Sequence, residues 1–159
     1  MKQKSVAIVG AAETTEMGKL PNVGQLQLHA DAALNAAADA GLSIQDIDGV
    51  ATAGHNPVEL SHYLGITPTW LDGTSVGGCS FMLHVRHAAA AINEGLCTTA
   101  LITHGESGRS GQGRPMVGGI PTLFQSQFER PFGVTRPPTM FTIPVMRYMK
   151  DFGLTEEKL

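Results

Sequence analysis

Residues 72–110 read DGTSVGGCSFMLHVRHAAAAINEGLCTTALITHGESGRS, and this stretch decides which fold the sequence predicts. A short loop rich in glycine leads into a segment with helical spacing, which ends at Gly95. The apolar positions on one face of this predicted helix are Met82, Val85, Ala89 and Ile92. Residues 98–105 then form an apolar run typical of a buried strand. The stretch therefore predicts a helix between two strands.

Cys79 is the residue in this stretch whose chemistry admits two interpretations. The unpaired backbone N–H groups at the start of a helix favour a nucleophilic thiolate, and they can also serve as an oxyanion hole. A free cysteine is equally typical of a packed core, and no histidine adjoins Cys79 in the sequence. The residues alone leave both interpretations open. Cys97, at the start of the following strand, is predicted only to pack.

The rest of the first 110 residues alternates between strand and helix patterns. Strands are expected at 5–13, 46–54 and 69–75, and a short helix at 59–66. A longer helix is expected after Asn22, its predicted N-cap, with Gly41 just past its end. This alternation is typical of a layered α/β domain with crossover helices.

From residue 105 the chain becomes rich in glycine, proline and arginine, and a loop of this length is usually functional. Residues 139–153 resume a helical pattern that Gly153 ends, with Pro144 tolerable only near the first turn. Thr155 is the expected N-cap of a further helix, whose first turn carries two glutamates.

Composition excludes several classes of function. The chain has 159 residues and a net charge of −3, without a basic stripe for nucleic acid. Its two cysteines make no disulfide framework, and no zinc spacing exists among its six histidines. For His84 and His87, three residues apart, an exposed or core role is favoured over metal binding. The apolar run at the N-terminus is too short for a signal peptide or a membrane span, so we expect a cytoplasmic chain.

The glycines do not predict a nucleotide site. VGAAETTEMG lacks the G-x-G-x-x-G spacing, and GESGRSGQG lacks the lysine of a phosphate-binding loop. His104, Glu106 and Arg109 follow the strand at 98–105, where ligands of open α/β sheets bind. They line a pocket or form a salt bridge on a solvated loop, and both interpretations stay open.

The stretch 72–110 resembles the thiolase superfamily, in particular the sterol-carrier-protein-type thiolases and thiolase-like proteins. VAIVGAAET, DIDGVATAG, FERPFG and MRYMKDFGLTEEKL extend the resemblance over essentially all 159 residues. It implies the first half of a thiolase-like layered α/β fold, a mixed sheet with packed helices. The implied domains are 1–110 and, as the start of the family's inserted loop (cap) domain, 111–159. The second half, which carries the family's catalytic histidine, would lie outside this sequence.

Thiolases place their acylated cysteine at the start of this helix, and ungapped counting from INEG puts that position on Gly78. Cys79 is one residue further on, a rotation of about 100°. The resemblance thus implies carbon–carbon bond chemistry on an acyl-CoA, either acyl transfer (thiolysis) or retro-aldol cleavage with Gly78 as an oxyanion donor. The implied catalytic residues are Gly78 and Cys79, and the implied substrate-binding residues are Ser80, His104 and Glu106.

The resemblance also implies partners. We expect no bound cofactor or metal, with coenzyme A entering as part of the substrate. A homodimer is expected through residues 69–75, with Trp70 near the interface, and many relatives pair with a small OB-fold, zinc-ribbon protein. The alternative is a non-catalytic thiolase-like subunit that binds an acyl-CoA or a partner protein.

Overall fold

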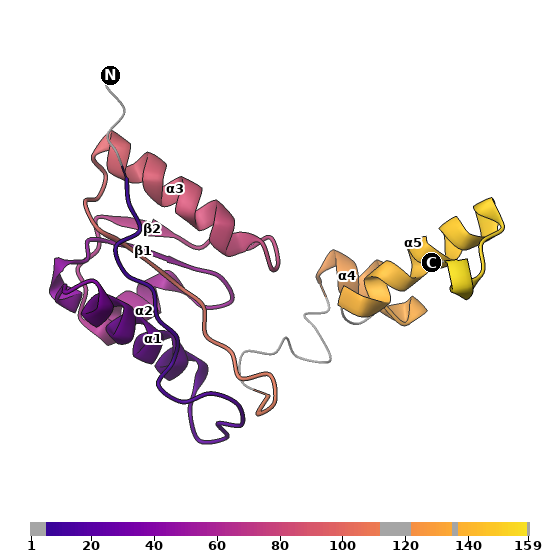
Figure 1. The fold of residues 1–159 in the computed structure, drawn as a ribbon, viewed down its shortest axis with the longest axis horizontal. Coiled ribbons are helices and arrows are strands. Elements are labelled where there is room, and N and C mark those ends of the chain that lie inside the picture. Colours follow the sequence, from indigo (N-terminus) through magenta and orange to yellow (C-terminus); the bar gives the residue numbers. More distant parts are fainter. Residues whose placement is uncertain (1–5, 112–121, 135–136, 159) are drawn as a thin grey trace. The chain divides into compact units, whose positions relative to one another are not determined.

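The computed structural model describes residues 6–111, 122–134 and 137–158. The chain forms two compact units, Met1–Arg114 and Pro115–Leu159 (Figure 1). The expected boundary at residue 110 lies near this division. The assignment of the second unit to an inserted loop domain stays a prediction.

A three-stranded parallel sheet is the centre of the first unit. Its strands are β1 (Gly49–Thr52), β2 (Trp70–Asp72) and β3 (Ala100–Thr103), in the order β2-β1-β3. These confirm the strands expected at 46–54, 69–75 and 98–105. The central strand β1 is buried along its whole length. The antiparallel strands that a mixed sheet requires are not found among the described residues.

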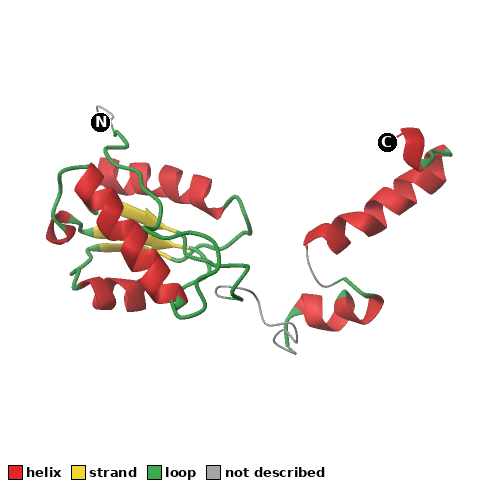
Figure 2. Ribbon diagram, turned by 60° about the horizontal axis from the view of Figure 1, so that its bottom comes forward, coloured by secondary structure: helices red, strands yellow, loops and turns green. Residues whose placement is uncertain are grey.

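Helices cover both faces of this sheet, as Figure 2 shows. α1 (Gln25–Asp39) and α2 (Pro57–Leu64) lie on one face, while α3 (Ser80–Glu94) lies on the other (Figure 1). A 3₁₀ turn, η1 (Ile44–Asp46), joins α1 to β1. The core is a cluster of aliphatic side chains from the sheet and its helices: Ala33, Ile47, Val50, Leu60, Ile66 and Leu101.

Glycine ends the helices where the sequence predicted it. Gly41 follows α1 with a φ of 68°, and Gly95 ends α3 in the left-handed region with a φ of 76°. The start of α1 differs from expectation, because its N-cap is Gly24 and not Asn22. The N–H of Gly24 donates to the side chain of Gln27 at 2.8 Å, so the first turn is capped from inside the helix.

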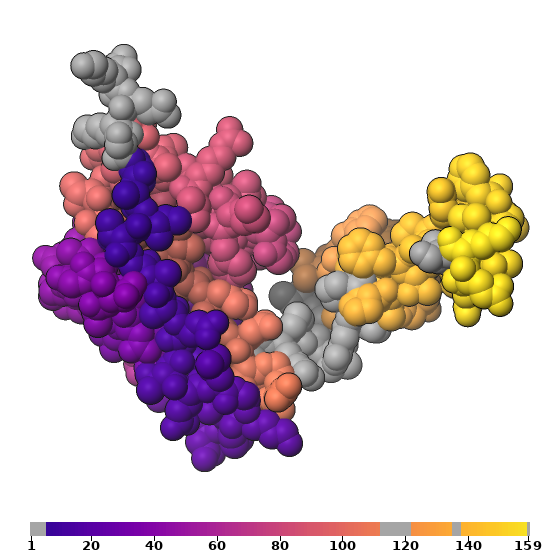
Figure 3. Space-filling view, in the orientation of Figure 1, coloured from indigo at the N-terminus to yellow at the C-terminus, as the bar shows by residue number. Residues whose placement is uncertain are grey.

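The strand expected at 5–13 is absent from the described part of this segment, residues 6–13. Ile8 and Val9 are 78% and 63% exposed, and Figure 3 shows the segment, in indigo, on the surface. The physical reason is that no described strand pairs with it. It is held to α1 instead, where the Ala11 N–H donates to Asp39 at 3.0 Å.

The buried face of α3 is also different from the expected one. Met82 and Val85 are 77% and 43% exposed. The buried residues of α3 are small or polar: Ser80, His84, Ala88 and Ala91. Short side chains let the helix approach the sheet closely, and the Nε2 of His84 is satisfied by the carbonyl of Thr74 at 2.9 Å. The prediction that His84 has a structural role is confirmed.

The second unit consists of short helices and one long one. They are α4 (Phe124–Phe128), η2 (Arg130–Phe132), α5 (Pro137–Phe152) and η3 (Glu156–Lys158). Part of the expected loop is therefore helical, while its residues 112–121 and 135–136 lie outside the described residues. Gly153 follows α5 with a φ of 62°, as predicted, and η3 begins after Thr155.

Pro144 contradicts the expectation that proline is tolerable only near the first turn of this helix, because it lies inside α5. Proline has no N–H to donate to the carbonyl of Met140 one turn earlier. Met140 is 40% exposed, so solvent can reach this part of the helix and satisfy the carbonyl. None of the helices in the described residues is long and apolar enough to cross a membrane.

Candidate functional site

The carboxyl ends of the three parallel strands meet at one edge of the sheet. β1 ends at Thr52, β2 at Asp72 and β3 at Thr103, so the loops that follow them share this edge. In Figure 1 the first turn of α3 also lies at this edge. Open α/β sheets bind ligands at this position. The loops bring His55, Cys79 and His104 to the same end of the fold.

The loop before α3 is held in shape by the buried hydroxyl of Ser80. This hydroxyl donates to the carbonyl of Gly77 at 2.6 Å and accepts from the N–H of Val76 at 3.0 Å. Gly77 has a φ of 85°, a conformation that strains any residue with a side chain. The hydroxyl of Ser80 therefore positions the loop, and its expected role in substrate binding stays a prediction.

Gly78 and Cys79 form the open end of this helix. A Cβ built on Gly78 has no atom within 4 Å, so the space beside it is empty of protein. Gly78 is not among the glycines with positive φ, so Gly77 is the position in this loop that requires glycine. Among the described residues, the backbone N–H groups of Gly78 and Cys79 have no hydrogen-bond acceptor.

Cys79 is exposed and is the N-cap of α3. Its thiol lies 3.7 Å from the carbonyl of Val76. In the described part of the chain no imidazole or carboxylate contacts this thiol, so it has no base to accept its proton. Cys97 is buried, as predicted, and burial, with Asp48 adding to it, raises the pKa of its thiol.

His104 and Glu106 follow β3 and interact with one another. The Nε2 of His104 lies 3.6 Å from a carboxylate oxygen of Glu106. The ring of His104 also lies against that of Phe81 in the first turn of α3, with centroids 4.7 Å apart. The fold therefore brings one predicted substrate-binding residue, His104, beside the helix that begins at Ser80.

Two further histidines at this end were not identified from the sequence. His29 of α1 is fully buried, and its Nδ1 lies 2.8 Å from the hydroxyl of Thr103. His55 follows β1, and its Nε2 is 3.2 Å from Glu59. Burial, together with the nearby His55 and His104, lowers the pKa of His29 from 6.5 to about 4. The sequence could have indicated a buried histidine here, because His29 lies between Leu28 and Ala30 on the apolar stripe of α1.

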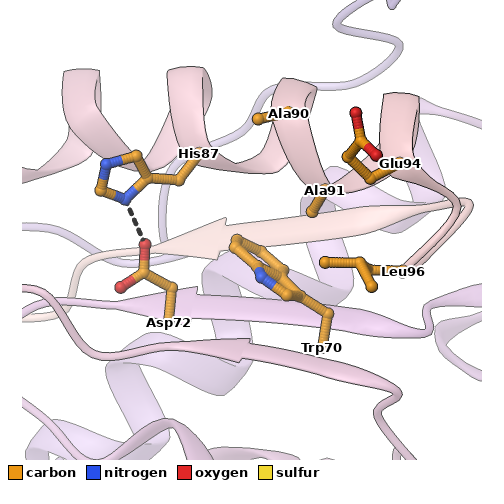
Figure 4. Close-up of a pocket in the computed structure, with 7 residues that line it drawn as sticks. All are labelled: Trp70, Asp72, His87, Ala90, Ala91, Glu94 and Leu96. Carbon is orange, nitrogen blue, oxygen red and sulfur yellow. Dashed lines mark hydrogen bonds and ion pairs between the residues drawn. The ribbon is translucent and has the colours of Figure 1, made fainter.

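A second group of polar residues lies at the edge strand β2. Asp72 accepts a hydrogen bond of 2.6 Å from the Nδ1 of His87, and Thr74 donates two more to its other oxygen. Burial alone would raise the pKa of Asp72, but these hydrogen bonds outweigh it and hold the pKa below its ordinary value. Figure 4 shows this pair at one end of a shallow pocket of about 430 Å³, with Trp70 along its floor.

Neither the histidines at the carboxyl ends of the strands nor the Asp72–His87 pair forms a metal site. Within the described ranges, no cluster of three or more His, Cys, Asp and Glu side chains could hold a metal ion. His84 and His87 bind different partners, the carbonyl of Thr74 and the carboxylate of Asp72.

Comparison with known proteins shows similarity to enzymes of steroid side-chain cleavage. No protein-family model matches the chain. It is 30% identical over 165 residues to the 17-hydroxy-3-oxo-4-pregnene-20-carboxyl-CoA lyase of Mycobacterium tuberculosis, covering 98% of this chain and 42% of the lyase. It is 29% identical to the steroid side-chain-cleaving aldolase of Thermomonospora curvata, covering 96% of this chain and 41% of the aldolase.

Solved structures show the same relationship. The Ltp2-ChsH2(DUF35) aldolase superposes with a TM-score of 0.74 and 28% identity, over 94% of this chain and 39% of that one. A monomeric SCP2-thiolase-like protein from Mycobacterium smegmatis shares the fold with a TM-score of 0.50 and 24% identity, over 60% of this chain and 22% of that one. The chain thus spans about two-fifths of the length of the curated relatives that it matches.

Proposed function

We propose that this chain, which is a thiolase-like protein, forms part of an enzyme that cleaves a carbon–carbon bond of an acyl-CoA by a retro-aldol reaction. Both curated relatives are named as enzymes of this kind, a lyase and an aldolase. The observation that carries the proposal is the open start of α3. There the N–H groups of Gly78 and Cys79 have no acceptor among the described residues, an added Cβ at Gly78 would meet no atom within 4 Å, and no base contacts the thiol of Cys79.

This arrangement suits an enolate better than a covalent acyl-enzyme. In retro-aldol cleavage, the electrons of the breaking bond move onto the thioester carbonyl, whose oxygen becomes negatively charged. Backbone N–H groups at a helix start stabilise such an oxygen, because they and the helix dipole present positive charge. No side chain must form a bond to the substrate, so a thiol without a base is sufficient.

The competing activity is acyl transfer with Cys79 as nucleophile. It requires a group that accepts the thiol proton, and the described residues supply none in contact with Cys79. The competing role is a non-catalytic subunit that binds an acyl-CoA or a partner protein. A full-length protein that binds coenzyme A thioesters but leaves every one of them intact would favour that role.

A partner protein is the second element of the proposal. The name of the solved Ltp2-ChsH2(DUF35) aldolase joins two components. We propose that this chain likewise assembles with a small OB-fold, zinc-ribbon protein, which helps to shape the substrate channel. We also propose a homodimer through β2, whose outer edge has no neighbouring strand among the described residues. The proposed location is the cytoplasm, and coenzyme A is needed only as part of the substrate.

The test is to incubate the full-length protein with a β-hydroxyacyl-CoA whose hydroxyl carbon carries two alkyl substituents. Release of a ketone and a shorter acyl-CoA in equal amounts, without added coenzyme A, supports the retro-aldol reaction. A product that forms only when free coenzyme A is added, with an acyl adduct on Cys79 by intact mass, contradicts it and supports thiolysis.

A further inference from the structure

His29 is a fully buried polar side chain whose bonding capacity is only half used. Its Nδ1 is paired with the hydroxyl of Thr103 at 2.8 Å, across 74 residues of sequence. Its Nε2 is buried and has no hydrogen-bond partner among the described residues. An unpaired polar atom in a core costs about 1–3 kcal/mol, and the buried Nδ1 of His84 carries the same cost. His29 differs from His84 in its position beside Gly105 and the ring of His104.

The backbone that follows β3 is pressed against this imidazole. A Cβ added to Gly105 would lie 2.7 Å from the Cδ2 of His29 and 2.8 Å from its backbone nitrogen. Only glycine fits at 105 without a shift of the backbone. The chain that leaves β3 and carries His104 therefore lies directly against His29.

The side chain of His104 has three neighbours in this arrangement. Its ring meets that of His29 edge-on, with centroids 6.3 Å apart and an interplanar angle of 76°. It also meets the ring of Phe81 at 4.7 Å between centroids and the carboxylate of Glu106 at 3.6 Å. Phe81 lies two residues beyond Cys79, within one helical turn of the free N–H groups.

We propose that His104 is the residue that accepts the hydroxyl proton in the cleavage reaction, and that His29 is a positioning residue that holds it there. This inference rests on the proposed retro-aldol function and adds the proton acceptor to it. The substrate class is a coenzyme A thioester with a hydroxyl group on its β-carbon.

The step balances without any further reactant. An imidazole nitrogen of His104 takes the hydroxyl proton, and the O–H electron pair forms the carbonyl bond of the ketone. The bond between the α- and β-carbons breaks, and its electrons become the enolate of the thioester. The proton then passes from His104 to the α-carbon, which yields the shorter acyl-CoA and restores the neutral imidazole.

The charges around His104 agree with this role. The titratable groups that face it are Glu106 on its own segment and His29 on α1, while α3 presents the uncharged ring of Phe81. Because its pKa is lowered to about 4, His29 is neutral at physiological pH and places no positive charge beside His104. The carboxylate of Glu106 lies 3.6 Å from the Nε2 of His104.

The test measures ketone release by the full-length protein from a β-hydroxyacyl-CoA across a range of pH. The variants are His104→Gln, His29→Phe, His29→Asn and, as a matched control, His62→Gln on the exposed face of α2. His104→Gln should lower kcat by about a hundredfold or more and remove the acidic limb of the pH profile. His29→Phe should lower kcat by about tenfold with KM unchanged, because the ring of His104 is displaced from its productive position.

His29→Asn keeps a donor or acceptor near the Thr103 hydroxyl but removes the ring that lies against His104, so it should lower kcat as well. His62→Gln should match the wild type. A His104→Gln variant with more than about a tenth of the wild-type kcat would overturn the proton-acceptor role. A His29→Phe variant that folds and matches the wild type, or that changes only KM, would show that His29 merely packs.

A structural readout separates this inference from the proposed function. Ring protons of His104 and Phe81 should show a nuclear Overhauser effect in the wild type that weakens in His29→Phe and persists in His62→Gln. If it persists in His29→Phe, the positioning role is wrong, whatever the activity. If the folded wild-type protein cleaves no carbon–carbon bond, the proposed function and the catalytic role of His104 both fail.

Discussion

The hydroxyl of Ser80 donates a 2.6 Å hydrogen bond to the carbonyl oxygen of Gly77 and so closes the turn that begins α3. The Ser80 hydroxyl also accepts the N–H of Val76 at 3.0 Å. One buried side chain therefore fixes the backbone on both sides of the turn. The unpaired N–H groups of Gly78 and Cys79 owe their direction to this turn, which makes the proposed oxyanion site a property of the loop.

Ser80→Ala should destabilise the protein. The change removes the acceptor of the Val76 N–H and the donor to the Gly77 carbonyl, which costs about 0.5–1.5 kcal/mol of unfolding free energy for each hydrogen bond. Urea denaturation of the full-length protein measures the loss. We also expect a lower kcat, since the free N–H groups lose their fixed direction. An unchanged unfolding free energy would show that the turn holds without the hydroxyl.

Gly77→Ala and Gly78→Ala should separate folding from function. Alanine at 77 must adopt a φ near 85°, which costs about 1–2 kcal/mol of unfolding free energy. Alanine at 78 meets no atom within 4 Å and should leave stability almost unchanged. Its methyl group enters the space where the thioester carbonyl is proposed to bind, so activity should fall sharply. Full activity of a folded Gly78→Ala protein would place the substrate elsewhere.

Cys79→Ala should retain much of the activity. The N–H groups and the helix dipole survive the change, so we expect a loss of kcat/KM smaller than about a hundredfold. Steady-state kinetics with an acyl-CoA substrate, and intact mass after incubation with it, make the test. Near-complete loss, together with a stable acyl adduct on the wild-type thiol, would restore an ordinary thiolase mechanism.

Local signals in the sequence predicted the helix ends and three strands. Gly41 and Gly95 could be identified because a left-handed residue after a helix is a local requirement. Residues 6–13 have the composition of a strand, yet a strand exists only where another strand pairs with it, and composition does not show the partner.

The candidate site was only partly predictable for a related reason. His104 follows a strand and could be proposed from that position alone. The role of His29 depends on Thr103, 74 residues away, and on the backbone at Gly105. Such a contact exists only in the folded chain. A serine at a helix start suits both a ligand and a turn, and the structure adds only that the Ser80 hydroxyl donates to the carbonyl of Gly77; its role in substrate binding stays a prediction.

The titration of His29 should make stability depend on pH. Its pKa is lowered from 6.5 to about 4 in the folded protein, so the unfolded chain binds a proton in that interval and the folded one does not. The stabilisation is complete above pH 6.5 and is lost as the pH falls towards 4, by about 3 kcal/mol in total. The slope of unfolding free energy against pH should be smaller in His29→Phe than in the wild type and His62→Gln. Equal slopes in all three would contradict the assignment.

Trp70 should mark the proposed dimer interface. It lies on the edge strand β2, along the floor of the pocket of about 430 Å³ between that strand and α3 (Figure 4). An open strand edge beside an apolar hollow is a surface on which a second copy can pair its own edge strand and bury its own Trp70. Trp70→Glu in the full-length protein should therefore shift the mass measured by light scattering from dimer to monomer at micromolar concentration, because a carboxylate would be buried without a partner.

Val58→Glu, at a 56% exposed side chain of α2, is the matched control and should leave the dimer intact. A wild-type monomer under the same conditions, as the Mycobacterium smegmatis relative is described, would contradict the interface altogether.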